Sequence, residues 1–137
     1  MIGGLVLMRR KEIVHRDLSY KIMEAVFEVH NQLGPGFLES VYEAALESEL
    51  HSRRISFERQ KKIDIYYKTE KIGIHRLDLL IDNQVIFELK AIANLLPIHQ
   101  QQAKSYLKAT NLQLAILVNF GTSRVQYERI LNKHTEI

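Results

Sequence analysis

The fold is predicted chiefly from residues 72–91, Ile72-Gly-Ile-His-Arg-Leu-Asp78-Leu-Leu-Ile-Asp82-Asn-Gln-Val-Ile-Phe-Glu88-Leu-Lys90-Ala91. It predicts two apolar, β-branched strands around a polar turn at Asp82-Asn83. Asp78, Glu88 and Lys90 interrupt this apolar hairpin, and such charges are costly there unless they are paired, bound to metal or facing water. Glu88 and Lys90 are two residues apart on a strand and therefore share a face. Two carboxylates and an ammonium group at one place favour a divalent-metal phosphodiesterase site.

The length of the hairpin loop decides whether this site can form. A two-residue turn would put Asp78 and Glu88 on opposite faces of the hairpin. A three-residue loop, residues 82–84, or a β-bulge puts Asp78 directly opposite Glu88, at cross-strand distance. The sequence therefore predicts an odd-length loop or a bulge.

Composition sets broader limits. The 137 residues predict one domain that buries roughly two-thirds of its unfolded surface, with tails at 1–14 and 132–137. The absence of cysteine excludes disulfides and cysteine-ligated metal centres and fits a cytoplasmic location. The apolar run from Leu5 to Met8 is too short to span a membrane. A net charge of +3 is compatible with nucleic acid but weak support for it.

Two helices precede the strands. Apolar residues at intervals of three and four predict a helix from Asp17 to Leu33, with Asp17 or Ser19 as N-cap and Gly34-Pro35-Gly36 as its end. A second helix is expected from Phe37 or Leu38 to about Arg53. In its first turn lie Glu39 and Tyr42. From the residues alone, Glu39 can simply favour the helix dipole and Tyr42 can be a partly buried aromatic residue.

The rest of the chain completes an α/β pattern. A strand from Ile55 to Tyr67, a turn over 68–71 and the 72–91 hairpin predict an antiparallel meander. A loop over 92–98 leads to a helix from His99 to Thr110, where His99 caps or begins the helix. The apolar run 112–120 predicts a strand buried on both faces, and 124–130 predicts a last strand. Since the helix supplies a crossover, 112–120 pairs in parallel with 84–91.

Three sets of residues carry a resemblance to a known family. They are Gly36-x-x-Glu39-x-x-Tyr42, the trio Asp78, Glu88 and Lys90, and Gln102-x-x-x-Tyr106. In this order the chain resembles the GxxExxY family of the PD-(D/E)XK nuclease superfamily over about residues 17–130. The resemblance implies a restriction-endonuclease-like α/β core, a mixed sheet flanked by helices in the order α-α-β-β-β-α-β-β. Leu77 departs from the pattern, since the superfamily's name has proline before the aspartate.

The resemblance also implies a chemistry. Asp78, Glu88 and the backbone carbonyl of Leu89 would hold Mg²⁺ or Mn²⁺, with Glu39 as an outer ligand or water-positioning base. Lys90 would orient the attacking water. The other expected site residues are Gln102 and Tyr106, as hydrogen-bonding groups, and Arg76 and Tyr42, as substrate contacts. The implied function is hydrolysis of nucleic acid, with DNA favoured over RNA, by a cytoplasmic enzyme that can need a second copy to cut two strands.

Other interpretations stay open. Glu88 and Lys90 can form an exposed charge pair of little value to stability. A nuclease fold can also lack catalysis and bind nucleic acid or a protein partner, because folds host many functions. The six histidines show no spacing typical of zinc ligands, and His75 is expected on the face opposite Asp78 if the strand is regular.

Overall fold

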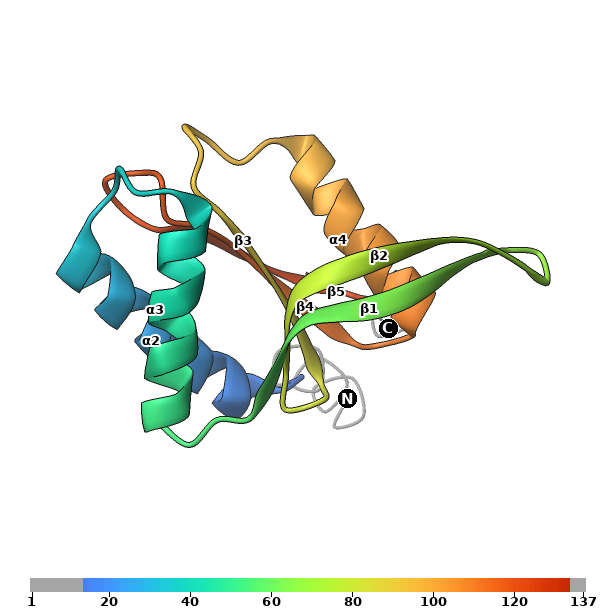
Figure 1. Ribbon diagram of the computed structural model, residues 1–137, viewed down its shortest axis with the longest axis horizontal. Helices are drawn as coiled ribbons and strands as arrows, with labels where there is room; N and C mark the ends of the chain where they lie inside the picture. The colour runs from blue at the N-terminus through green and yellow to red at the C-terminus, as the bar shows by residue number, and fades with distance from the viewer. Residues whose placement is uncertain (1–13, 134–137) are drawn as a thin grey trace, which may run out of the picture.

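A computed structural model describes residues 14–133. Its elements are α2 (Arg16–Leu33), α3 (Glu39–Ser52), β1 (Phe57–Tyr67), β2 (Glu70–Ile81), β3 (Val85–Lys90), α4 (Pro97–Thr110), β4 (Leu114–Asn119) and β5 (Gln126–Leu131). The five strands form one sheet in the order β1-β2-β3-β4-β5 (Figure 1). The β3–β4 pair is parallel, and the other three pairs are antiparallel. The expected element order, mixed sheet and parallel crossover are confirmed.

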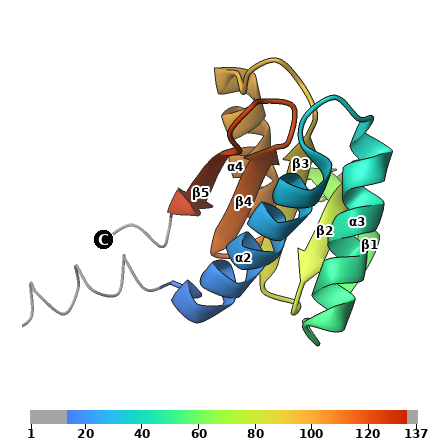
Figure 2. The ribbon, with the colours of Figure 1, turned by 90° about the vertical axis from the view of Figure 1, so that its left-hand side faces the viewer.

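Two apolar clusters cover the two faces of the sheet. The larger one lies under α2 and α3 and includes Val26, Leu46 and Phe87. The smaller one lies under α4 and includes Leu77, Ile86 and Leu107. All six residues of β4 are buried, as expected for a strand covered on both faces, and Figure 2 shows α2 and α3 side by side on one side of the sheet.

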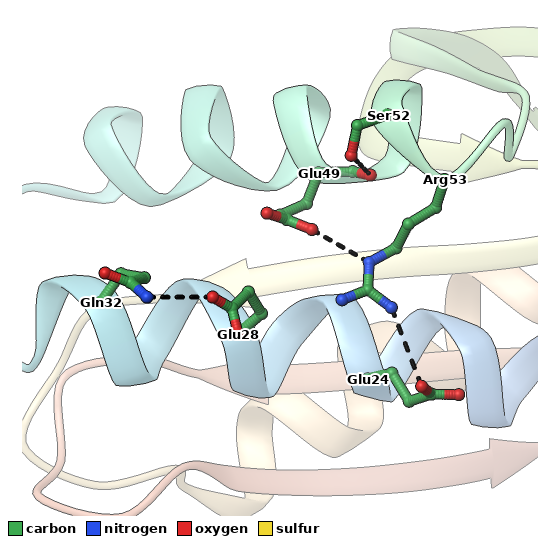
Figure 3. Close-up of polar contacts among 6 residues, drawn as sticks. All are labelled: Glu24, Glu28, Gln32, Glu49, Ser52 and Arg53. Atoms are coloured by element: carbon green, nitrogen blue, oxygen red, sulfur yellow. Dashed lines mark hydrogen bonds and ion pairs between the residues drawn. The ribbon is translucent and has the colours of Figure 1, made fainter.

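The joint between α2 and α3 depends on glycine. Gly34 and Gly36 have φ values of 68° and 114°, which L-residues with a Cβ rarely adopt. The helix α2 starts at Arg16 with His15 as N-cap residue, so the expectation that Asp17 or Ser19 caps it is wrong. At the other end of the pair, Arg53 contacts Glu49 of α3 at 2.9 Å and Glu24 of α2 at 3.8 Å (Figure 3).

The loop between β2 and β3 has three residues, 82–84, because Ile81 pairs with Val85. Asp82 and Asn83 both take left-handed φ values, which these residue types tolerate better than most. The odd loop length that the shared site requires is therefore confirmed.

The strand β2 changes its pairing at Asp78. It pairs with β3 only from Leu79 to Ile81, but it pairs with β1 along nearly its whole length. Leu77 belongs to the cluster under α4, whereas Leu79 belongs to the cluster under α2 and α3. Residues two apart on a regular strand share a face, so the alternation of faces breaks at Asp78. We call this place, where β2 leaves β3 at Asp78, the fork.

Opposite the fork, β1 is irregular too. Gln60 has a φ of 49° and falls between the paired residues Arg59 and Lys61. Its side-chain amide donates to Glu43 of α3 at 2.9 Å. The ladder keeps its register across Gln60, since Arg59 pairs with Leu79 and Lys61 with Leu77, and the register shifts only further along, between Ile65 and Tyr66.

Beyond the fork, β1 and β2 continue as a two-stranded ribbon over residues 61–76, here called the arm. Its turn is Lys68-Thr69, since β2 already starts at Glu70 and not at residue 72 as expected. The arm ends at the side of the molecule opposite α2 and α3 (Figure 1).

The helix in the crossover from β3 to β4 starts two residues earlier than the sequence predicted. The helix α4 begins at Pro97. Proline suits the first helical position because a backbone N–H there would have no partner within the helix, so its absence costs nothing. His99 caps the helix as expected, since its Nδ1 accepts the Leu96 N–H at 2.9 Å.

Buried asparagines fix both ends of β4. Asn119 is fully buried; its side chain accepts the Ile92 and Gly121 N–H groups and donates to the Ile92 carbonyl and to Gln126. Asn132, expected to start a tail, is buried and donates to the carbonyls of Leu107 and Leu112. The remaining expected tail residues, 1–13 and 134–137, lie outside the described residues. Within residues 14–133, no helix is long and apolar enough to cross a membrane.

The close approach at Gly121 gives a stability prediction. A Cβ there would lie 2.3 Å from the Ile92 carbonyl oxygen, and the Asn119 hydrogen bonds oppose any shift of that backbone. We expect Gly121→Ala to lower the free energy of unfolding by about 1–3 kcal/mol. Urea unfolding measures this, with Gly73→Ala as the control, because a Cβ at Gly73 meets nothing within 4 Å. Equal stability of the two variants would contradict the prediction.

Candidate active site

A small cleft of about 80 Å³ lies at the fork. Its walls come from β2, the end of β3, the first half of α4 and β4. The residues that line it are His75, Arg76, Asp78, Glu88, Lys90, His99, Gln102, Ala103, Tyr106 and Leu117. Six of them are residues that the sequence analysis selected, so the fold brings Arg76, the trio of the hairpin and both residues of the Gln-x-x-x-Tyr motif to one place.

The two carboxylates of the cleft have different surroundings. Asp78 Oδ2 accepts the backbone N–H of Leu89 at 2.9 Å. The side chain thus makes a hydrogen bond to β3 at a level where the β2 backbone is no longer paired with β3. Glu88 is buried, and its Oε1 has no hydrogen-bond partner. The nearest basic nitrogen recorded for it is His75 Nε2, at 3.8 Å, which is too long for a hydrogen bond.

Burial and the neighbouring Asp78 raise the pKa of Glu88 far above its ordinary value of 4.5, and Lys90 opposes this only in part. A buried carboxylate without a counter-charge is expected to hold a proton. A divalent cation at this place would supply the missing charge and would displace the proton. The unpartnered oxygen and the hard oxygen donors around it therefore fit Mg²⁺ or Mn²⁺.

Glu39 lies at the first turn of α3 and not in the wall of the cleft. Its pKa is raised first by partial burial and then by Asp78, while Lys90 lowers it, so its carboxyl group is within electrostatic reach of the cleft. Within residues 14–133, no three His, Cys, Asp or Glu side chains are grouped to hold one metal ion. Glu39 is therefore not a third direct ligand in this arrangement, and an outer role through water is the one that fits.

On the opposite wall, α4 presents Gln102 and Tyr106. The Tyr106 ring stacks on the His75 ring, with centroids 3.9 Å apart and planes at 15°. Burial raises the pKa of the Tyr106 hydroxyl, and Glu88 and Asp78 raise it further. The hydroxyl thus stays protonated as a donor at neutral pH.

His75 is the residue that sequence reasoning missed. Regular alternation placed it on the face away from Asp78, and this expectation is wrong because the alternation breaks at the fork. Burial lowers the pKa of His75, although Asp78 acts in the opposite direction. The one available signal was the aspartate itself, a poor strand former in the middle of an apolar strand.

The structure does not bring Tyr42 to the cleft, so the expected substrate contact is corrected. Tyr42 is fully buried, and its ring stacks on Phe120 at 4.8 Å. Its hydroxyl donates to the Gly34 carbonyl at 2.5 Å and accepts the Phe37 N–H at 3.2 Å. Tyr42 therefore holds the glycine joint closed and sets where α3, and with it Glu39, begins.

A family model described as the PD-(D/E)XK nuclease superfamily matches residues 16–130. The chain belongs to this superfamily. Membership suggests nuclease activity, with nucleic acid as the substrate. The crystal structure of SSO0001 is similar over 96% of this chain and 78% of that one, with a TM-score of 0.56 and 22% identity, which supports the fold alone. Comparison with curated proteins finds no match.

The structural role of Tyr42 can be tested by removing one oxygen. Tyr42→Phe leaves the Gly34 carbonyl and the Phe37 N–H without their partner, and we expect a loss of about 1–3 kcal/mol in the free energy of unfolding. Urea unfolding measures it, with Tyr127→Phe as the control because Tyr127 is 49% exposed. A loss no larger than that of the control would show that the joint does not need Tyr42.

The raised pKa of Glu88 predicts how stability depends on pH without metal. Above pH 4.5 the unfolded chain has lost this proton while the folded protein keeps it, so stability falls as pH rises. Glu88→Gln keeps the shape and removes the titration. In EDTA, we expect the variant to be more stable than the wild type at pH 8, with a smaller difference at pH 5. Melting temperatures at both pH values check this; a constant difference would refute it.

Proposed function

We propose that the protein is a Mg²⁺- or Mn²⁺-dependent nuclease of the GxxExxY branch that hydrolyses phosphodiester bonds of nucleic acid, with DNA favoured over RNA. The observation that carries this is the buried Glu88 carboxylate, one oxygen of which has no partner, beside Asp78 in a cleft that also contains Lys90. Burying such a group is unfavourable unless a cation neutralises it.

The metal ligands in this proposal are Asp78, Glu88 and the Leu89 carbonyl. In a β-strand, the N–H and C=O of one residue point to the same neighbouring strand. Since the Leu89 N–H bonds to Asp78, its carbonyl points toward Asp78 as well. A bound metal supplies Lewis acidity and a coordinated water of lowered pKa.

The other residues of the cleft act on the water and the phosphate. Lys90 follows Glu88 on the same face of β3, where its ammonium group holds the attacking water and offsets negative charge on the phosphorane. Glu39 accepts a proton or a hydrogen bond from water at the rim. Gln102 and Tyr106 donate to the phosphate oxygens, and Arg76 contacts a phosphate on the arm side.

The size of the cleft restricts what enters it. A cleft of about 80 Å³ has room for a metal ion, a few waters and phosphate oxygens. Bases and sugars must therefore stay outside. The chemistry proposed for the cleft applies to any phosphodiester and does not select a sequence.

A catalytically silent nuclease fold is the second candidate. The absence of a third acidic or histidine ligand within residues 14–133 favours it, because a set of two carboxylates binds metal weakly without substrate. Such a module would still bind nucleic acid or a protein partner through the surfaces around the cleft.

Metal binding separates the two candidates without a guess about the substrate. At about 10 mM Mg²⁺, a site with millimolar affinity stabilises the wild type by roughly 1.4 kcal/mol, a rise of a few degrees in melting temperature. We expect no rise in Asp78→Asn or Glu88→Gln. Glu24→Gln is the matched control, since Glu24 is exposed on α2 and does not line the cleft. A wild type that is indifferent to Mg²⁺ and Mn²⁺ would favour the silent module.

Cleavage tests the catalytic step directly. Duplex DNA, single-stranded DNA and RNA, incubated with Mg²⁺ or Mn²⁺, give the substrate class. We expect Lys90→Ala to lower the rate constant by about 10²–10³-fold while the metal-induced rise in melting temperature remains. If Asp78→Asn and Lys90→Ala cleave as fast as the wild type, the cleavage comes from a contaminant, and the proposal is refuted.

A further inference from the structure

The arm carries the excess positive charge of the protein. Residues 61–76 contain five Lys and Arg residues against two acids, Asp64 and Glu70, a net charge of +3. The whole chain has 19 basic and 16 acidic residues, also +3. The remaining residues therefore contain 14 of each and cancel. The net charge of the whole chain therefore equals the net charge of the arm, the ribbon that leaves the cleft.

Two of these cations lie directly opposite each other. Lys62 and Arg76 are cross-strand partners in the β1–β2 ladder, and both are exposed. Like charges at this position destabilise a strand pair. No ion pair is recorded for either of them, or for Lys68 at the turn, among residues 14–133. An anion along this face would relieve the repulsion.

The arm is also unusually apolar for an exposed element. Tyr66, Tyr67, Ile72 and Ile74 are all more than half exposed. The inner face near the fork packs on α4, where Ile63 joins the apolar cluster and His75 stacks on Tyr106. None of the described residues covers the outer face of the arm or either face of its tip.

We propose that the arm enters the major groove of duplex DNA and holds the duplex with a phosphate over the cleft. This inference rests on the proposed function and names the substrate class of the same site. The major groove of B-DNA, about 12 Å wide, admits a two-stranded β-ribbon. From Lys62 to the turn at Lys68 the arm reaches about 20 Å, enough to follow the groove past several base pairs.

The shape of the arm argues against other occupants. The major groove of A-form RNA is too deep and narrow for side chains to read, so the arm selects DNA. Pairing of β1 with a second copy is disfavoured, because the left-handed backbone at Gln60 and the charged residues Arg59 and Lys61 interrupt this edge strand. Lysines bind the phosphates on both sides of the groove, and the exposed Ile and Tyr side chains lie against thymine methyl groups.

Binding measured without Mg²⁺ tests the arm independently of catalysis. Fluorescence anisotropy in EDTA compares a duplex DNA of about 20 base pairs, the corresponding single strand and an RNA duplex of the same sequence. The variant is the double substitution Lys62→Gln with Lys68→Gln, which spares Arg76 in the cleft. The control is Lys21→Gln with Arg54→Gln, which removes the same charge from exposed positions on the α2–α3 side.

We expect the wild type to prefer duplex DNA, and the arm variant to lose about 10-fold or more in affinity for it while the control changes little. The slope of log affinity against log salt should flatten by about 2, one for each lost phosphate contact. Equal weakening on all three nucleic acids would overturn the groove assignment. An arm variant that binds like the control, or changes only self-association, would overturn the whole inference.

Failure of this inference and failure of the proposed function give different results. If the wild type cleaves no nucleic acid with Mg²⁺ or Mn²⁺, arm-dependent binding of duplex DNA still supports the inference. If the cleft cleaves nucleic acid but the lysines of the arm do not affect duplex binding, the proposed function stands and the inference falls.

Discussion

The hydrogen bond from the Leu89 N–H to the Asp78 carboxylate is the contact on which the site depends. In a continuous antiparallel ladder, the backbone of β2 would bond to β3 at this level. Here the β2–β3 ladder spans only Leu79 to Ile81. At Asp78 the side chain, in place of the backbone, bonds to β3. One interaction therefore ends the ladder, starts the arm and fixes a carboxylate beside Glu88. Gln60, whose amide bonds to Glu43 of α3, lies opposite Asp78, and β1 keeps its pairing with β2 on either side of it.

The electrostatics of the cleft oppose folding when no cation is present. Glu88 lies in the second half of β3, a strand that is buried along most of its length, and burial of its charge costs stability whenever it is ionised. The sheet can bear this cost because β3 and β4 contribute many buried apolar residues to both clusters. A local conflict between burial and charge, surrounded by consistent packing, is typical of functional sites.

Much of the fold and the grouping of the site could be predicted, because the relevant rules act locally along the chain. For Asp78 and Glu88 to share a site, face parity required an odd-length loop or a bulge between their strands, and the crossover helix predicted that β3 and β4 are parallel. Parity failed for His75 because the break at Asp78 depends on a tertiary hydrogen bond to Leu89, which no spacing reveals. The complete burial of Tyr42 and the burial of Asn132 were missed for the same reason, since their partners at Gly34 and Leu107 are brought to them by the fold. The start of α4 at Pro97 was within reach of the sequence, because proline favours the first helical position.

Under the proposed function, β2 links selection of the substrate to catalysis, because it contributes both to the cleft and to the arm. In this proposal the cleft contacts only what every phosphodiester shares, so a preference for duplex DNA comes from outside it. The strand β2 carries Asp78 at the fork. On the N-terminal side of Asp78, the same strand forms half of the positively charged arm without an intervening loop. A duplex that bends or tilts the arm would act on the β2 backbone next to Asp78, and so on the geometry of the carboxylates. Under the proposed function, correct docking of the duplex and correct assembly of the metal site are therefore coupled through the backbone of residues 76–78.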